Sequence, residues 1–336
     1  MILLPLTFSS SRPNRPWQSS GRRSRLPRFK LRLYFRGPQP LHRRVSGITR
    51  LRAKPELISQ RPAYDDSETS LKPPAIALTA EERDQFEKLG YFSRPSVFTA
   101  DEIDEMRCAA EDVHRKVLEA ADQADAAPVE QVDNQKYQEV LGSTIKWEWN
   151  ENLRAVRSME PVFQIDARMA KVIDDPRVWG PCAEVIGVER LSLFSDKLNV
   201  KRPGGAPFPF HQEGPYWAYG AEDLERVITL IIYIDEATVD NGCLWVIPGS
   251  HRYGPLESLQ DRGTLGRLYT DIDRLDESPV PVALPEGSVA FFHRDIVHGS
   301  QTNRTDQDRR AYLLAYQPEG LHQWRNGEQR DIGESI

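Results

Sequence analysis

Phe210-His211-Gln212-Glu213 places a histidine and a carboxylate one residue apart, and 85 residues after Glu213 a second histidine follows in Val297-His298-Gly299-Ser300. Alternate side chains of a strand point to the same side, so His211 and Glu213 can face one ion from a single strand or its end. His298 follows the apolar run 288–292 and must arrive from a strand distant in the sequence. Two imidazoles and one carboxylate suit a mononuclear non-haem iron(II) site, because they leave one face open for oxygen and an organic co-substrate. The spacing favours a small antiparallel barrel or double-sheet jelly roll that holds the metal inside one end.

Two further segments extend this pattern. Between the two histidines lies Asp240-Asn241-Gly242-Cys243-Leu244-Trp245-Val246-Ile247-Pro248-Gly249-Ser250-His251, and Arg309 and Arg310 follow His298 at the start of the strand-like run 311–316. An arginine at this point can offer a planar fork of donors to a carboxylate beside the metal. Strand alternation would send one of the two arginines inward and the other to solvent.

Together these segments resemble the phytanoyl-CoA dioxygenase family of iron(II)- and 2-oxoglutarate-dependent oxygenases, over about residues 80–318. Members of that family show a His-x-Asp pair, an Asn-Gly-x-Leu-x-x-x-Pro-Gly-Ser-His segment, and a late His-Gly-Ser with an Asn and an Arg behind it. The resemblance implies a mainly β fold with flanking helices and a double-stranded β-helix (jelly-roll, cupin-like) core.

The resemblance also implies a role for each matching residue. His211, Glu213 and His298 would hold Fe(II), and Arg309 would grip the distal carboxylate of the co-substrate 2-oxoglutarate with Ser300 as a helper. With O2 as second co-substrate, the implied activity is hydroxylation of a C–H bond of a small organic molecule, with release of succinate and CO2.

This sequence departs from the family pattern at Glu213, where an aspartate is usual. The extra methylene lets the carboxylate swing further, but metal–oxygen distances of about 2.0 to 2.2 Å stay within reach. A halogenating variant is disfavoured, because Glu213 occupies the coordination place that halide would take. Two alternatives stay open. One is a cupin-type metalloenzyme that uses no 2-oxoglutarate and needs no clamp at Arg309, and the other is a catalytically inactive family member that acts as a binding protein.

Polar alternation marks the strand that precedes the ligand pair. Lys197, Asn199 and Lys201 would share one face of that strand, where any of them could touch a co-substrate oxygen. We include Lys197 among the candidate co-substrate ligands, although exposure of the whole row to solvent is the commoner explanation of such a pattern.

Aromatic residues and a further histidine lie close to the motif. Tyr216 and Trp217 follow the ligand pair directly and are candidates for the wall of a substrate pocket, with core packing as the alternative. His293 competes with His298 for the place of third ligand, although it looks like part of a turn that leaves a strand.

Charge divides the chain. Residues 1–55 carry 14 of the 44 Lys and Arg residues, so residues 56–336 hold 30 basic residues against all 50 acidic ones, a balance of −20. This acidic part is a poor candidate for nucleic-acid binding, which depends on phosphate neutralisation. The basic leader, residues 1–75, resembles an organelle transit peptide or the product of a start assigned too far upstream, and we expect it to be disordered.

Cysteine usage and hydropathy indicate the compartment. Three widely spaced cysteines, Cys108, Cys182 and Cys243, favour a reducing environment over a disulfide framework. No apolar stretch reaches the roughly 18 to 20 residues that a membrane span needs. We therefore expect a cytoplasmic protein, with a mitochondrion or plastid as the alternative if the leader is a presequence.

We expect residues 76–336 to form a single dioxygenase domain with N-terminal helices. Two capping boxes predict these helices, one at Thr79 that ends at Gly90 and a longer one from Thr99. The polar interval 123–139 predicts a loop, either folded over the site or a plain surface connection. Strands are predicted over 226–234, 243–247, 288–292 and 311–317.

Overall fold

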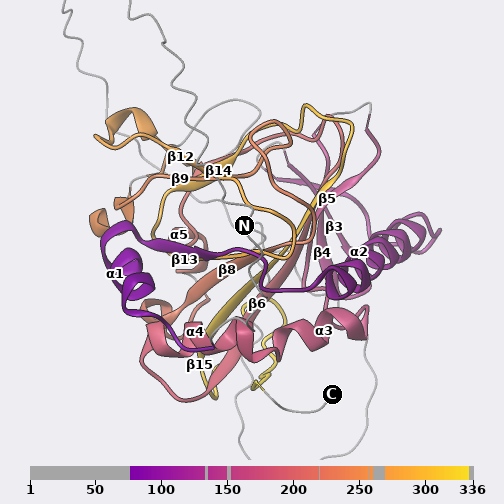
Figure 1. Ribbon diagram of the computed structural model, residues 1–336. Helices are drawn as coiled ribbons and strands as arrows, with labels where there is room; N and C mark the ends of the chain where they lie inside the picture. The colour runs from indigo at the N-terminus through magenta and orange to yellow at the C-terminus, as the bar shows by residue number, and fades with distance from the viewer. Residues whose placement is uncertain are drawn as a thin grey trace, which may run out of the picture. The chain divides into compact units, whose positions relative to one another are not determined.

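The computed structural model describes residues 76–132, 135–149, 153–218, 220–256, 258–259 and 269–332, and two antiparallel sheets dominate this part of the chain (Figure 1). The larger sheet has nine strands: β1 (Tyr91–Arg94), β13 (Val289–His293), β8 (Ile228–Tyr233), β15 (Arg309–Pro318), β6 (Leu191–Lys201), β5 (Val156–Glu160), β4 (Ser143–Trp147), β3 (Gln135–Val140) and β2 (Glu130–Val132). The smaller sheet has four: β12 (Val280–Val282), β9 (Leu244–Val246), β14 (His298–Ser300) and β7 (Phe208–His211). A two-stranded ribbon joins β10 (Ser258–Leu259) to β11 (Tyr269–Thr270).

Helices flank the larger sheet. They are α1 (Ala80–Leu89), α2 (Ala100–Ala121), α3 (Ala167–Ile173), α4 (Pro176–Ile186) and the short α5 (Gly214–Trp217), with 3-10 turns η1 (Leu224–Arg226), η2 (Ser250–Tyr253) and η4 (Ile272–Arg274). Helix α4 packs on β8 and β15, and α2 contacts α3 and β3. In Figure 1 α3 and α4 lie on the side of the larger sheet away from β9, β12 and β14.

Strand alternation gives the larger sheet two different faces. Leu230 and Ile232 of β8 join the apolar cluster that includes α2, α3 and α4, whereas Ile231 and Tyr233 pack toward the smaller sheet with Leu244. Because both faces are covered, β8 is a continuous apolar run rather than an alternating one. The face turned toward the smaller sheet, called the inner face below, carries the candidate site.

The predicted elements are largely confirmed. Thr79 and Thr99 each form a full capping box with the glutamate three residues later, and α1 ends at Gly90 with φ of +81°. The four predicted strands appear as β8, β9, β13 and β15, with ends within about two residues of those expected. The mainly β class with flanking helices is therefore confirmed.

The predicted loop over 123–139 is wrong from Glu130 onward, because β2 and β3 form an antiparallel hairpin there. Its polar residues are stabilised by ladder hydrogen bonds and by tertiary contacts. The amide of Gln138 donates to the backbone oxygens of Ala121 and Ala127, at 3.3 and 2.8 Å. The hairpin lies at the β2 edge of the sheet.

The predicted leader, residues 1–75, lies outside the described residues. Within the described residues, every helix is too short or too polar for a transmembrane segment.

Candidate metal centre

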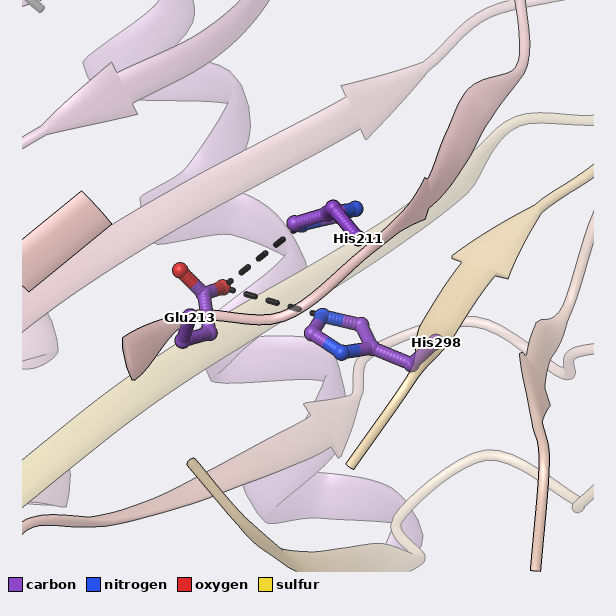
Figure 2. A group of neighbouring side chains, drawn as sticks. All are labelled: His211, Glu213 and His298. Atoms are coloured by element: carbon purple, nitrogen blue, oxygen red, sulfur yellow. Dashed lines mark ion pairs between the residues drawn. The ribbon is translucent and has the colours of Figure 1, made fainter. Parts of the chain in front are cut away.

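Three side chains from the smaller sheet and the turn after it converge on one point (Figure 2). Oε1 of Glu213 lies 4.0 Å from Nε2 of His211 and 3.7 Å from Nε2 of His298. The candidate ligand atoms all lie within 4.8 Å of one another, and no other group of His, Cys, Asp or Glu in the described part of the chain meets this criterion. The ligand atoms of His211, Glu213 and His298 are therefore close enough to bind one ion after small changes of side-chain conformation. His293, the competing third ligand, is not part of the group.

Each imidazole is oriented by its own strand. Nδ1 of His211 lies 2.7 Å from the backbone oxygen of Pro209, and Nδ1 of His298 lies 3.1 Å from that of Ile296. Donation of Nδ1–H to a carbonyl fixes the tautomer and leaves the lone pair of Nε2 facing the carboxylate, as in most histidine metal ligands. The donor set therefore fits a divalent cation.

The protonation states agree with this donor set. Burial, with the neighbouring His298 ring, lowers the pKa of His211 to about 3, so this imidazole is neutral at physiological pH. Burial alone would raise the pKa of Glu213, but Lys197 and the two imidazoles outweigh it and hold that pKa well below its usual range. A neutral ring and an ionised carboxylate are the forms that bind a metal.

A tight turn brings Glu213 to the site. Strand β7 ends at His211, and Glu213 has helical backbone angles as the residue before α5. Between them, the amide of Gln212 points away and donates to the backbone oxygens of Gly254 and Asp295, at 2.9 and 2.6 Å. The pair therefore sits at the end of a strand, one of the two placements expected.

Arg309 lies on the inner face at one end of the site. It pairs across the sheet with Lys201 and is 3% exposed, its Nε has no hydrogen-bond partner, and it forms no ion pair within the described residues. Lys201 Nζ donates to Oγ of Ser300 at 2.7 Å and to the backbone oxygen of Gln301. Ser300 leaves the same face of β14 as His298, about 7 Å further along the strand.

Arg157 adds a third cation at this end. Its guanidinium lies between the rings of Phe208 and Trp149, 3.9 and 4.3 Å from their centroids, and Nη2 donates to the backbone oxygen of Pro207 at 2.8 Å. Its Nε and Nη1 are buried without a partner. Burial, Arg309 and Arg157 together lower the pKa of Lys201 well below its usual range. We call Arg157, Lys201, Ser300 and Arg309 the clamp end.

Arg310 points to the opposite face of the sheet, as alternation predicts, but its side chain is buried rather than exposed to solvent. Its Nη2 and Nε each lie 2.7 Å from an oxygen of Asp235, and Nη1 lies 3.0 Å from Glu111 of α2. The expected exposure is wrong because α2 covers this face and supplies a carboxylate.

Asn199 and Lys201 of the polar row on β6 are buried and Lys197 is half-buried, so exposure to solvent is a wrong explanation of the alternation. Lys201 is 2% exposed and Asn199 9%. Lys197 lies apart from the clamp end, because it pairs with Leu313 of β15, four residues from Lys201. At a rise of about 3.3 Å per residue this separates the two lysines by about 13 Å. The structure therefore groups Lys201, rather than Lys197, with Arg309 and Ser300.

The two aromatic candidates occupy different places. The ring of Tyr216 lies edge-on to His211, with 5.7 Å between centroids. Trp217 is 3% exposed and packs against Phe194 at 5.0 Å, so core packing accounts for it. The ring of Phe292, which also packs on the inner face, has its centroid 5.0 Å from that of His298.

Four further charged residues were missed by sequence reasoning: Arg157, Lys146, Glu160 and Arg325. Arg157 sits at a register shift where β4 pairs with β5, and that shift gives no signal in the sequence. Lys146 and Glu160 belong to strands that no clear alternation predicts.

The chain also matches a known protein family. The family model described as "Phytanoyl-CoA dioxygenase (PhyH)" matches residues 86–311. The chain belongs to this family. Among its relatives, the methylphosphonate hydroxylase of Gimesia maris is 36% identical over 135 residues, which cover 40% of this chain and 48% of that protein. A probable alpha-ketoglutarate-dependent hypophosphite dioxygenase of Stutzerimonas stutzeri is 29% identical over 251 residues, 71% of this chain and 78% of that protein.

The chain spans about half the length of the first two relatives it matches. Of the solved structures, EctD of S. alaskensis superposes with a TM-score of 0.55 at 22% identity, over 75% of this chain and 79% of that one. The carbocyclase SnoK gives 0.54 at 19% identity, over 76% and 96%. These comparisons confirm the predicted family and the jelly-roll fold.

Proposed function

We propose that this protein is an Fe(II)- and 2-oxoglutarate-dependent dioxygenase that hydroxylates a C–H bond of a small organic molecule. His211, Glu213 and His298 would hold the metal, and Arg309, with Ser300 and Lys201, would bind the distal carboxylate of 2-oxoglutarate. When bound, Fe(II), 2-oxoglutarate and O2 supply the oxidation, which yields succinate, CO2 and hydroxylated product.

The observation that carries this proposal is the unpaired positive charge at the clamp end. Glu148 is a buried carboxylate that interacts with Arg157 and Lys201, but none of the three cations of the clamp end forms an ion pair within the described residues, and an excess of buried positive charge costs several kcal/mol. The distal carboxylate of a dicarboxylate that reaches from the metal to these side chains would supply negative charge that this end lacks. The spacing of His298 and Ser300, about 7 Å along β14, suits a five-carbon diacid.

The chain's own residues would then position the reactants. The planar donors of Arg309 fit a carboxylate in bidentate fashion. Lys201 holds Ser300 by a 2.7 Å hydrogen bond, so the hydroxyl is oriented before the co-substrate arrives. Tyr216 lies against His211 and Phe292 against His298, and these two rings would limit the access of water to the bound metal.

Two other functions, a cupin-type metalloenzyme that does not use 2-oxoglutarate and an inactive binding protein, explain fewer features of the site. A cupin-type enzyme without 2-oxoglutarate would leave the buried charge of Arg309 unexplained. An inactive binding protein would have no use for a neutral His211 opposite an ionised Glu213.

The names of two relatives, methylphosphonate hydroxylase and 2-aminoethylphosphonate dioxygenase, denote small anionic substrates. We propose the same coarse class here, a small molecule that carries an acidic group. Cys108, Cys182 and Cys243 are free thiols in the structure. We propose a reducing compartment, such as the cytoplasm, on that basis.

Anaerobic spectroscopy tests the proposal. Addition of Fe(II) and 2-oxoglutarate to the purified protein should produce a weak visible charge-transfer band. The band should be absent in His211→Ala and strongly reduced in Arg309→Ala, while Arg115→Ala, a change at an exposed arginine of α2, should leave it intact. A band of full strength in Arg309→Ala would refute the clamp, and no band in the wild-type protein would refute the function.

A further inference from the structure

A second group of charged side chains lies on the inner face, away from the clamp end. Glu160 of β5 is 4% exposed, and Oε2 lies 3.2 and 3.1 Å from Nε and Nη2 of Arg325. The hydroxyl of Ser195 donates to its other oxygen. Lys197 Nζ is 3.9 Å from Oε2. Both oxygens of Glu160 are therefore already engaged by Ser195 and Arg325, with Lys197 at the edge of ion-pair range.

Lys146 completes the group. It lies on β4 opposite Ser158 of β5, which in turn pairs with Asn199 of β6, so these three side chains form a row across the inner face. Lys146 forms no ion pair within the described residues, and its Nζ lies 5.5 Å from the ring centroid of Tyr137. Burial, Lys197 and other neighbouring charges lower its pKa to about 7.

The charges in this group do not balance. Lys197 and Arg325 flank Glu160, Lys197 also attracts Glu213, and Lys146, whose pKa is lowered to about 7, adds a third positive charge when it is protonated. A purely structural ion-pair network tends toward neutrality, because every uncompensated buried charge costs free energy. The excess of positive charge is what a site for an anion requires.

The position of the group points toward the metal centre. Glu160 and Glu213 of the metal centre both attract Lys197, so this lysine links the group electrostatically to the metal centre. The same lysine is about 13 Å along β6 from Lys201 of the clamp end. Asn199, between the two lysines on this face, has a buried Oδ1 without a hydrogen-bond partner. The inner face thus has two groups of cations. 2-Oxoglutarate bound at the clamp end would leave the group of Lys146, Lys197 and Arg325 without an added anion.

We propose that Lys146, Lys197 and Arg325 form an anion subsite that binds a phosphonate group of the substrate and so presents the neighbouring carbon to the metal. This assignment rests on the proposed function and adds the residues that select the substrate. A phosphonate suits the subsite better than a monocarboxylate does, because it offers three oxygens and up to two negative charges to three separate donors. Glu160 orients Arg325 and keeps the empty subsite from being excessively positive.

Lys146 is the residue to test, since it is uncompensated and its replacement by an apolar chain leaves no carboxylate unpaired. The variants are Lys146→Met and the conservative Lys146→Arg, with Lys171→Met as the matched control, because the side chain of Lys171 is 75% exposed on α3. The probes are methylphosphonate, its neutral dimethyl ester, and acetate. Binding is measured by calorimetry on the metal-free protein and by the shift of the anaerobic charge-transfer band.

In the wild-type protein methylphosphonate should bind, and the ester and acetate should bind at least tenfold more weakly. Lys146→Met should weaken methylphosphonate binding by about 10- to 100-fold, the effect of a lost charged hydrogen bond. Lys146→Arg should restore most of it, and Lys171→Met should match wild type. The band formed by Fe(II) and 2-oxoglutarate alone should be the same in all four proteins, which separates this subsite from the clamp end.

Two results would overturn the assignment. The first is equal affinity of wild type and Lys146→Met for methylphosphonate, and the second is acetate or the ester binding as tightly as methylphosphonate. Either result leaves the proposed function standing if the charge-transfer band still forms. Absence of the band in wild type, with methylphosphonate binding intact in calorimetry, would instead refute the proposed function and support the subsite.

Discussion

His298 of β14 stands opposite His211 of β7 in the antiparallel register, with 4.3 Å between ring centroids. His293 ends β13 in the other sheet, where its ring lies 6.1 Å from Phe86 of α1 and 5.3 Å from His251. Two histidines with only four residues between them thus belong to different sheets. Sheet membership, rather than distance along the sequence, selects the candidate ligand.

We predict that His298→Ala loses Fe(II) affinity by at least the roughly 10- to 100-fold that follows loss of a group supporting a metal ligand. His293→Ala should bind Fe(II) as wild type does, because its ring packs against α1 and η2. Anaerobic calorimetric titration with Fe(II) measures both. Wild-type affinity in His298→Ala, or loss of affinity in a folded His293→Ala, would contradict the assignment of the third ligand.

Gly242→Ala should disturb the clamp end. Gly242 has φ of +81°, and a Cβ there would lie 2.4 Å from the backbone oxygen of Gln301 and 3.1 Å from Nζ of Lys201. We expect a stability loss beyond the roughly 1 to 2 kcal/mol cost of a left-handed residue, and a several-fold rise in KM for 2-oxoglutarate. Gly320→Ala is the control, because Gly320 has φ of +86° with nothing within 4 Å of its Cβ. Equal effects of the two substitutions on KM would show that the contact with Lys201 is unimportant.

Arg309→Met and Arg310→Met should have opposite consequences. Arg310 is paired with Asp235 in a buried site, so its loss should destabilise the protein by about 3 kcal/mol. Arg309 has no carboxylate partner within the described residues, so its loss should leave the free energy of unfolding of the co-substrate-free protein equal or higher. Urea denaturation measures stability, and the charge-transfer band measures binding of 2-oxoglutarate. If Arg309→Met proves to be the more destabilising change, Arg309 has a structural anion partner.

Asp196→Asn should change how stability depends on pH. Burial raises the pKa of Asp196 to about 6, although Oδ2 accepts hydrogen bonds from the backbone N–H groups of Val162 and Phe163 and from the hydroxyl of Tyr312. Between pH 4 and pH 6 the folded protein binds the proton more tightly than the unfolded chain does. The contribution of this group to stability therefore falls as pH rises through that window and is constant above it.

An asparagine does not titrate, so the variant should gain on wild type by about 3 kcal/mol between pH 4 and pH 7. Urea midpoints at pH 4, 5, 6 and 7 measure this difference directly. A difference between the two proteins that stays flat with pH would show that Asp196 ionises normally in the folded state.

Local sequence signals predicted the elements whose causes are local. The capping boxes at Thr79 and Thr99 need only four consecutive residues, and both helices begin where expected. The apolar run 226–234 predicted β8, because a strand covered on both faces needs no polar residues. The hairpin of β2 and β3 escaped prediction, since its polar residues are stabilised by partners such as Gln138 with Ala121, which are distant in the sequence.

The sequence predicts the three metal ligands of the candidate site together with Arg309 and Ser300, but it gives no sign of Arg157 or of the charged group around Glu160. The ligand pair and His298 carry a spacing that geometry requires, whereas the burial of Lys201 depends on the smaller sheet that covers β6. Alternating lysines on a strand ordinarily face water, so the sequence favoured the wrong environment for them. Arg157, Lys146 and Arg325 come from three separate segments, and the fold alone brings them to the inner face.

The backbone oxygens of Pro209 and Ile296 orient the imidazoles of His211 and His298, each by a hydrogen bond to the ring two residues later. No side chain from elsewhere is needed for this aim, so substitutions on β4, β5 and β6 can reshape the surrounding chamber while the ion stays correctly held. If the proposed function is correct, evolution can change the substrate that the chamber accepts without rebuilding the metal-binding group.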